Sequence, residues 1–88
     1  PDTEGGDRVT VGRLQGIDRQ TGVITLERVK DWNVVSEEWR PYPGTLAVDA
    51  RGAVTVRGSR GISWSELQPG DNLYLVREGM KAMLILVQ

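Results

Sequence analysis

The sequence predicts a small all-β domain, and three observations lead to this prediction. The 88 residues are enough for one domain. The apolar residues lie in short runs separated by glycine, proline and aspartate, which is typical of many short strands. No stretch carries an apolar repeat of 3.6 residues that is long enough for a packing helix. Because closing a small sheet removes its exposed edges, we expect a five- or six-stranded Greek-key barrel that resembles the OB fold.

The first half of the chain contains two clear strands and one irregular segment. A strand is expected from Val9 to Asp18, and a second from Val23 to Val29. The turn 18–22 joins them, because aspartate hydrogen-bonds its own following backbone and glycine accepts a positive φ. Residues 33–40 fit either a short helix or an extended edge, and the nearby prolines favour an extended segment over residues 38–42. Residues 1–7 are expected to be a linker, and residues 8–88 the single domain.

The second half alternates strands with tight turns. Strands are expected over residues 45–48, 53–57, 72–78 and 81–87. Turns are expected at 49–52, 58–61 and 79–80, where glycine or aspartate occurs. One helical turn is expected near 63–67, since a serine can cap it and the following Pro-Gly ends it.

The stretch Gln68-Pro69-Gly70-Asp71 combines a tight turn with an acidic side chain. Gly70 can supply the positive φ that a turn after Pro69 requires. Asp71 can accept hydrogen bonds from the backbone of that turn. A catalytic carboxylate needs a partner acid, a base or a metal, and no such partner occurs at a recognisable spacing. We therefore interpret Asp71 as a structural residue and Leu67 as a core plug.

Composition argues against several classes of function. The chain contains no cysteine and no histidine, so the usual thiolate and imidazole ligands and bases are missing. The adjacent acids Glu37 and Glu38 point to opposite faces of a strand, and glycosidases need two converging carboxylates. No apolar run approaches the ~20 residues of a membrane helix. We expect no catalytic residues, no metal site, no cofactor and no insertion into a membrane.

Two groups of residues are candidates for binding. Trp32, Trp39 and Tyr42 lie close together in the irregular segment and could contact a protein or stack on the sugar rings of a cell-wall glycan. Trp32 and Trp39 could instead be core or partly buried residues, and this is the expectation that we favour. The second group consists of Arg51, Arg57 and Arg60, in a stretch without acids.

The arginine group raises the possibility of an OB-type nucleic-acid binder, which combines a basic groove with stacking aromatic residues. The net charge of −1 disfavours this possibility, because nucleic-acid modules are usually basic. Nucleic acid is therefore the less favoured partner, and the oligomeric state stays open.

Several stretches also resemble a known group of domains. These are Gly12, Leu14, Ile17-Asp18, Gly22, Ile24-Thr25-Leu26, a following tryptophan (Trp32 or Trp39), Leu67 to Val76 and Ala82 to Val87. They resemble small OB-like domains of unknown function in exported and cell-surface proteins of Gram-positive bacteria, some near S-layer repeats. The resemblance covers about residues 9–88 and implies a fold and an extracellular location, with a cytoplasmic location still open. It implies no catalytic residues.

The sequence thus predicts a non-enzymatic accessory or interaction domain. Two alternatives stay open: an OB-type binder of single-stranded nucleic acid, and a non-catalytic fragment of a larger enzyme.

Overall fold

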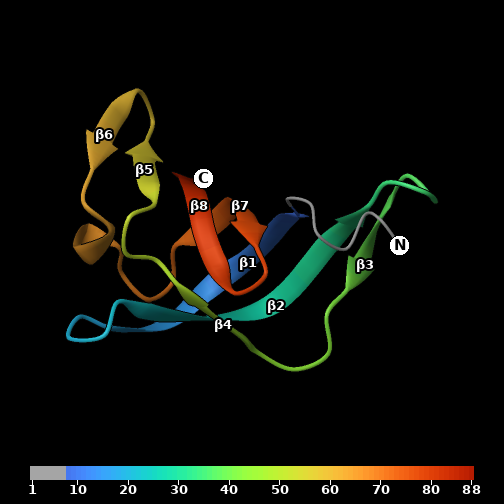
Figure 1. Ribbon diagram of the computed structural model, residues 1–88, viewed down its shortest axis with the longest axis horizontal. Helices are drawn as coiled ribbons and strands as arrows, with labels where there is room; N and C mark the ends of the chain where they lie inside the picture. The colour runs from blue at the N-terminus through green and yellow to red at the C-terminus, as the bar shows by residue number, and fades with distance from the viewer. Residues whose placement is uncertain (1–7) are drawn as a thin grey trace.

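The computed structural model describes residues 8–88, which form eight strands and one 3-10 turn. The expected linker 1–7 lies outside the described residues. The strands are β1 (Arg8–Asp18), β2 (Val23–Asn33), β3 (Glu38–Pro41), β4 (Leu46–Asp49), β5 (Val54–Arg57), β6 (Arg60–Ile62), β7 (Asn72–Glu78) and β8 (Lys81–Val87), and the turn η2 spans Trp64–Glu66 (Figure 1). The all-β prediction is confirmed.

Five of the strands form a ring-like sheet. β1 pairs with β2 and β7, β7 pairs with β8, and β4 pairs with both β2 and β8. The ring order is therefore β1-β2-β4-β8-β7 and back to β1. The link between β4 and β8 is parallel and short, with Asp49 opposite Lys81. The Asp49 N–H also donates to the Met80 carbonyl at 2.8 Å.

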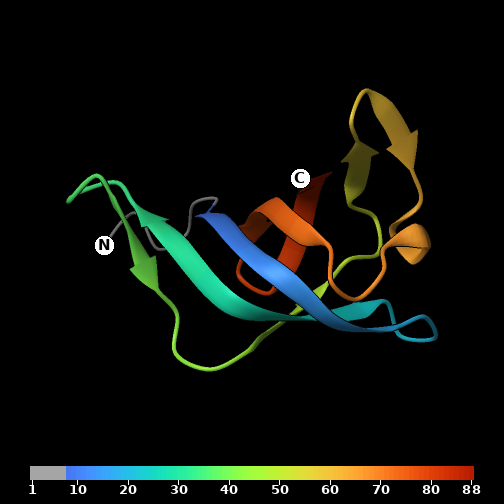
Figure 2. The same ribbon diagram turned by 180° about the vertical axis from the view of Figure 1, so that it is seen from behind.

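The other three strands extend from the ring as two projections. β3 pairs only with the end of β2, and the β5–β6 hairpin joins the sheet through β8. The two projections stand at opposite ends of the molecule (Figures 1 and 2). Residues 8–88 thus contain eight strands, of which five form the ring, whereas five or six were expected for the barrel. The sequence predicts a turn over all of 58–61, whereas only Gly58 and Ser59 lie between the paired residues Arg57 and Arg60, and Arg60 begins β6.

The core fills the inside of the ring. It consists of twelve buried apolar residues from the five ring strands and the loops between them: Leu14, Ile24, Leu26, Val29, Leu46, Val48, Ala50, Leu67, Leu73, Leu75, Ala82 and Ile85. The strands contribute at alternate positions, because side chains on a strand alternate between its two faces. Leu67 is fully buried, so its expected role as a core plug is confirmed.

The segment before β7 has the expected turn chemistry. Ser63 and Glu66 form a capping box around η2. Gly70 has φ 99°. A carboxylate oxygen of Asp71 accepts from the Gln68 N–H at 3.0 Å and from Arg57 at 3.2 Å. The structural interpretation of Asp71 is confirmed.

Two aspartates that open turns have pKa values below their usual range. The Asp18 carboxylate accepts from the N–H groups of Gln20 and Thr21, and these bonds lower its pKa. The pKa of Asp49 is lowered mainly by the Arg51 N–H. A carboxylate with a depressed native pKa adds stability above its unfolded-state pKa, and this stability is lost as the pH falls through the native pKa.

The lowered pKa values of Asp18 and Asp49 predict that wild type is more sensitive to acid than a variant in which neither side chain titrates. The Asp18→Asn/Asp49→Asn variant keeps an oxygen acceptor at both turns and loses the titration. We expect wild type to lose more stability than this variant between pH 5 and pH 2, as measured by urea unfolding at each pH. Parallel acid profiles for the two proteins would contradict the assignment.

The end of β2 is attached to the ring by a buried polar network. Arg77 of β7 is only 4% exposed and donates to both carboxylate oxygens of Asp31 at 3.1 Å. It also donates to Thr10 Oγ1 at 2.9 Å and to the Gly79 carbonyl at 2.6 Å. Thr10 in turn donates to Asp31. Because a buried charge needs paired hydrogen bonds, this network fixes β2 against β1 and β7 just before β2 leaves the ring.

A bulge marks the point where β2 begins to leave the ring. Arg28 and Val29 together oppose Gly12, since the β1–β2 register shifts between Val11 and Arg13. Arg28 has φ 55°, in the left-handed region where glycine is usual at such bulges. A Cβ at Gly12 would lie 3.3 Å from the Glu27 carbonyl oxygen, so the glycine permits a close approach of the two strands. Such bulges bend the strand that carries them.

Candidate functional site

The strongest candidate site is the projecting hairpin formed by residues 31–42, which we call the tryptophan hairpin. It contains the end of β2, the tip 34–37 and β3. Trp32 pairs directly with Trp39 across the two strands. Their ring centroids are 5.3 Å apart and their planes meet at 69°, an edge-to-face contact. This geometry is a favourable one for aromatic pairs, so the two rings hold each other in place.

The tip of the tryptophan hairpin is apolar and exposed. Val34 is 63% exposed and Val35 is 87% exposed. Trp32 and Trp39 below the tip are 37% and 38% exposed. Both tryptophans therefore lie outside the buried core, at the border between partly buried and exposed, so the partly buried form of the expectation fits better than the core form. Four large apolar side chains on one projecting hairpin form a surface of the kind that marks interaction sites.

The backbone of the tip is well defined. Asn33 Oδ1 accepts from the N–H groups of Val35 and Ser36 at 2.9 and 3.0 Å. The Glu37 N–H donates to the Asn33 carbonyl at 2.8 Å. The turn Asp18–Gly22 shows the same pattern, with side-chain bonds to two N–H groups and a bond from Gly22 N–H to the Asp18 carbonyl. Asn33 therefore presents Val34 and Val35 in a fixed turn.

Glu37 is strained at the position that Gly22 occupies in the first hairpin. Glu37 has φ 56°, and Gly22 has φ 83°. A side chain in the left-handed region costs about 1 kcal/mol relative to glycine. We expect Glu37→Gly to raise the free energy of unfolding by up to about 1 kcal/mol, as measured by urea denaturation. A loss of stability in this variant would contradict the strained turn.

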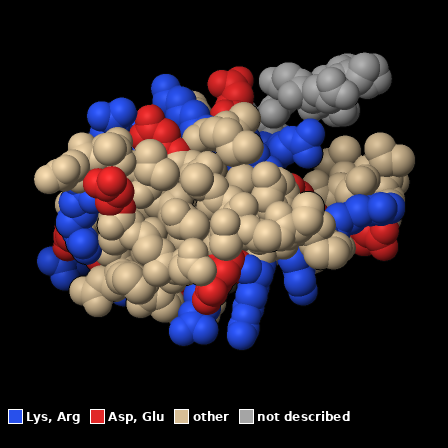
Figure 3. Space-filling model, turned by 90° about the horizontal axis from the view of Figure 1, so that it is seen from below, with Lys and Arg blue, Asp and Glu red and all other residues tan. Residues whose placement is uncertain are grey.

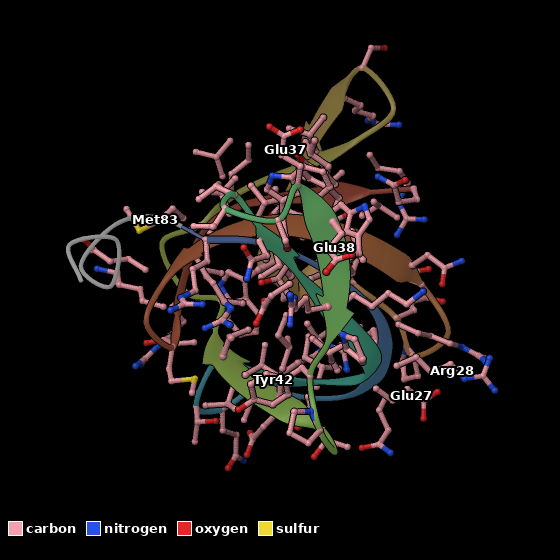
Figure 4. All side chains as sticks on the ribbon, turned by 90° about the vertical axis from the view of Figure 1, so that its right-hand side faces the viewer. Glu27, Arg28, Glu37, Glu38, Tyr42 and Met83 are labelled. Atoms are coloured by element: carbon pink, nitrogen blue, oxygen red, sulfur yellow. The ribbon has the colours of Figure 1, made fainter. Side chains whose placement is uncertain are left out.

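A hollow of about 400 Å³ lies beside the tryptophan hairpin. Its lining combines apolar side chains of the hairpin with charged groups, among them Arg8, Asp31 and Arg40, and it includes Tyr42. Tyr42 is half-buried and packs against the core, and its N–H donates to the Val29 carbonyl at 2.8 Å. Figure 4 shows Tyr42 near the foot of β3, away from the tip where Glu37 lies. Tyr42 therefore anchors the hairpin, whereas the tryptophans and valines are presented by it.

The arginine group occupies the opposite end of the molecule. Arg57 and Arg60 belong to the β5–β6 hairpin, which stands away from β3 in Figure 1. Arg57 is paired with Asp71 at 3.2 Å, and Arg51 with Asp49 at 3.5 Å. The structure thus does not bring the arginine group and the aromatic residues onto one surface. Seen from below, the molecule has a mostly uncharged face with both basic and acidic side chains around it (Figure 3).

Residues 8–88 contain no group of three or more acidic side chains that could hold a metal ion. They also contain no helix that is long and apolar enough to cross a membrane. Every fully buried side-chain nitrogen or oxygen in the same residues has a hydrogen-bond partner.

Comparisons with known proteins give no family assignment. No protein-family model, no curated protein and no solved structure matches the chain. The geometry of the molecule itself therefore carries the functional argument.

Proposed function

We propose that this chain is a non-enzymatic interaction domain that docks a partner protein through the tryptophan hairpin. The observation that carries the proposal is the exposed set Trp32, Val34, Val35 and Trp39 on a hairpin that projects from the ring. Exposed tryptophans at the centre of an apolar patch are typical anchors of protein interfaces. Arg28, at the bulge before the hairpin, and Glu37, at its tip, both have a positive φ, and backbone strain is often retained at functional sites.

The angle between the tryptophan rings favours a protein partner over a glycan. Stacking on successive sugar rings needs flat and accessible aromatic faces. With the planes at 69°, the edge of one ring covers part of the face of the other. The pair therefore makes a ridge rather than a flat platform, and a ridge fits an apolar pocket on a protein.

The free edge of β3 favours docking by side chains over the addition of a strand. The Tyr42 N–H points toward β2, so residues at odd positions, Trp39 and Pro41, direct their backbone groups outward. Pro41 has no N–H to offer, and proline at an edge blocks further pairing. A partner therefore reaches the tryptophan ridge and the valine tip rather than a bare strand.

The ring order supports the finer proposal of an OB-type barrel. Counted along the ring strands alone, β1, β2, β4, β7 and β8 are the first to the fifth, and their order around the ring is first, second, third, fifth, fourth. A five-stranded Greek-key barrel of OB type is described by such a closed order. In this proposal the β5–β6 hairpin and η2 connect the third and fourth barrel strands. A place on the surface of a Gram-positive bacterium, or in an exported protein, is proposed on the sequence resemblance alone.

An NMR titration distinguishes the three classes of partner. Indole and backbone signals are followed while single-stranded DNA, and separately peptidoglycan fragments, are added at low salt. We expect neither ligand to shift the indole signals of Trp32 and Trp39. Shifts of these signals with glycan would replace the protein partner by a cell-wall glycan. Salt-sensitive shifts at Arg51, Arg57 and Arg60 with DNA would make the domain a nucleic-acid binder.

A further inference from the structure

The outward side of four neighbouring strands carries apolar side chains in two rows. β1, β7, β8 and β5 follow one another in the sheet. The row that crosses them on the inner side is Thr10, Leu75, Ile85 and Thr55, and all four residues are buried. Because side chains alternate along a strand, the residues on either side of this row point outward.

The two outward rows are set by the strand registers. The first row is Val9, Val76, Leu84 and Val54. The second row is Val11, Tyr74, Leu86 and Val56. We call these eight residues the outer apolar face. None of them belongs to the core or to the side chains packed against it. Seven are half-buried, and Val54 is 62% exposed.

The strands β7 and β8 have the continuously apolar sequence that is typical of a sheet buried on both faces. β8 contains the unbroken apolar run from Ala82 to Val87, and β7 contains the run from Leu73 to Val76. A sheet with one wet face alternates apolar and polar residues, whereas strands buried on both faces are continuously apolar. The inner side of β7 and β8 faces the core. The outer side therefore has the composition of an interface.

One end of the outer apolar face is basic. The second row continues from Val11 onto β2 at Lys30. Lys30, Arg28 and Arg13 line a hollow of about 670 Å³ together with Val11. Arg13 lies 3.9 Å from Glu27, and within residues 8–88 Arg28 and Lys30 have no ion pair. Figure 4 shows Arg28 projecting on one side of the molecule and Met83 of β8 on the opposite side.

We propose that the outer apolar face docks an amphipathic protein segment whose acidic residues lie over Arg13, Arg28 and Lys30. Charge complementarity selects this occupant, because a segment with apolar side chains along one side and carboxylates at one end matches both the rows and the basic hollow. Strands lie about 4.8 Å apart, so the path from β5 to β2 measures roughly 19 Å, the length of a helix of about 12 residues. This surface is separate from the tryptophan hairpin, and the proposal goes beyond the proposed function.

A peptide selection tests the proposal. A library of random 16-residue peptides displayed on phage is selected on the wild-type chain and counter-selected on Leu84→Gln/Leu86→Gln. We expect the recovered peptides to carry apolar residues at a spacing of three or four and acidic residues gathered at one end. In fluorescence anisotropy, Arg28→Glu/Lys30→Glu should weaken binding of a recovered peptide at least 10-fold. Arg60→Glu, a charge reversal at the far end of the molecule, should leave it unchanged.

Several results would overturn the proposal. Recovery of no peptide, or of peptides without acidic residues, would do so. A peptide whose binding is lost in Trp32→Ser/Trp39→Ser would belong to the tryptophan hairpin instead. Self-association in analytical ultracentrifugation that is abolished by Leu84→Gln/Leu86→Gln would make a second copy the occupant. Pelleting with vesicles of phosphatidylcholine and phosphatidylglycerol, lost in the same variant, would make a lipid surface the occupant. If that variant fails to fold, Val54→Gln/Val56→Gln replaces it, because both residues lie near the edge of the sheet.

Discussion

Asp31→Ala is expected to lower the free energy of unfolding by about 3 kcal/mol, because it leaves the buried Arg77 guanidinium without its counter-charge. Arg77 is 4% exposed and makes two hydrogen bonds to Asp31. Without the carboxylate, the bonds to Thr10 and to the Gly79 carbonyl are left to hold a buried cation. Urea denaturation followed by tryptophan fluorescence measures the loss.

A double variant separates the ion pair from simple packing. Asp31→Leu/Arg77→Met removes both charges and keeps apolar volume at the two positions. Since replacing both partners is often far less harmful than removing one, we expect this variant to be more stable than Asp31→Ala. If the double variant is less stable than Asp31→Ala, the uncompensated charge of buried Arg77 is not the main cause of the stability loss in the single variant.

Leu67→Ala is expected to lower the free energy of unfolding by about 3 kcal/mol, as a buried leucine leaves a cavity when it is truncated. Leu67 is fully buried between η2 and β7. Its carbonyl accepts from Arg19 at 3.1 Å, which ties this loop to the first hairpin. The same urea denaturation provides the measurement.

The neighbouring residue supplies the matched control for this variant. Gln68 is exposed, and its backbone N–H, which alanine retains, donates to Asp71. Gln68→Ala should therefore change stability by no more than about 0.5 kcal/mol. Equal losses in the two variants would contradict the placement of Leu67 in the core.

Much of the fold follows from local sequence signals, because most of its turns contain glycine, which accepts a positive φ, or aspartate, which accepts hydrogen bonds from the turn backbone. The strands 72–78 and 81–87 and their Gly79 turn agree with the structure at both ends. A serine cap and the following Pro-Gly predict the short helical turn, and in the structure Ser63 is the cap, with Glu66 completing a capping box. In contrast, the sequence does not predict β6: Gly-Ser is a known signal of a two-residue hairpin, but Arg60-Gly61-Ile62 after it is not a run of apolar or β-branched residues.

The candidate site was harder to predict, because its hairpin breaks a local rule. Asn33 begins the turn at the tip as Asp18 begins the first turn. The positive-φ position, which is Gly22 in the first turn, is Glu37 at the tip, so the glycine signal of a hairpin is missing there. The segment therefore looked irregular. The exposure of Trp32 and Trp39 depends on how far β2 runs beyond the ring, and this depends on the distant residues Thr10 and Arg77. Single-sequence patterns do not reveal such long-range contacts.

The outer apolar face shows a different limit. The continuous apolar runs of β7 and β8 predict strands, but they do not show which side chains lie together on the outer side of the sheet. The cross-strand registers were required to place Val9, Val76, Leu84 and Val54 in one row. The sequence also does not predict that Arg13, Arg28 and Lys30 line one hollow, because this arrangement depends on the bulge at Arg28, for which the sequence has no signal.

The most direct test of the central claim is site-specific photo-crosslinking at the tip of the tryptophan hairpin. p-Benzoylphenylalanine is placed at Val35, or at Gln20 in the equivalent turn of the first hairpin, and each protein is irradiated in the cells that produce it. We predict one discrete protein adduct from position 35, absent from position 20 and suppressed by Trp32→Ser/Trp39→Ser. No adduct at position 35, or the same adduct from both positions, would contradict the claim that this hairpin docks a partner protein.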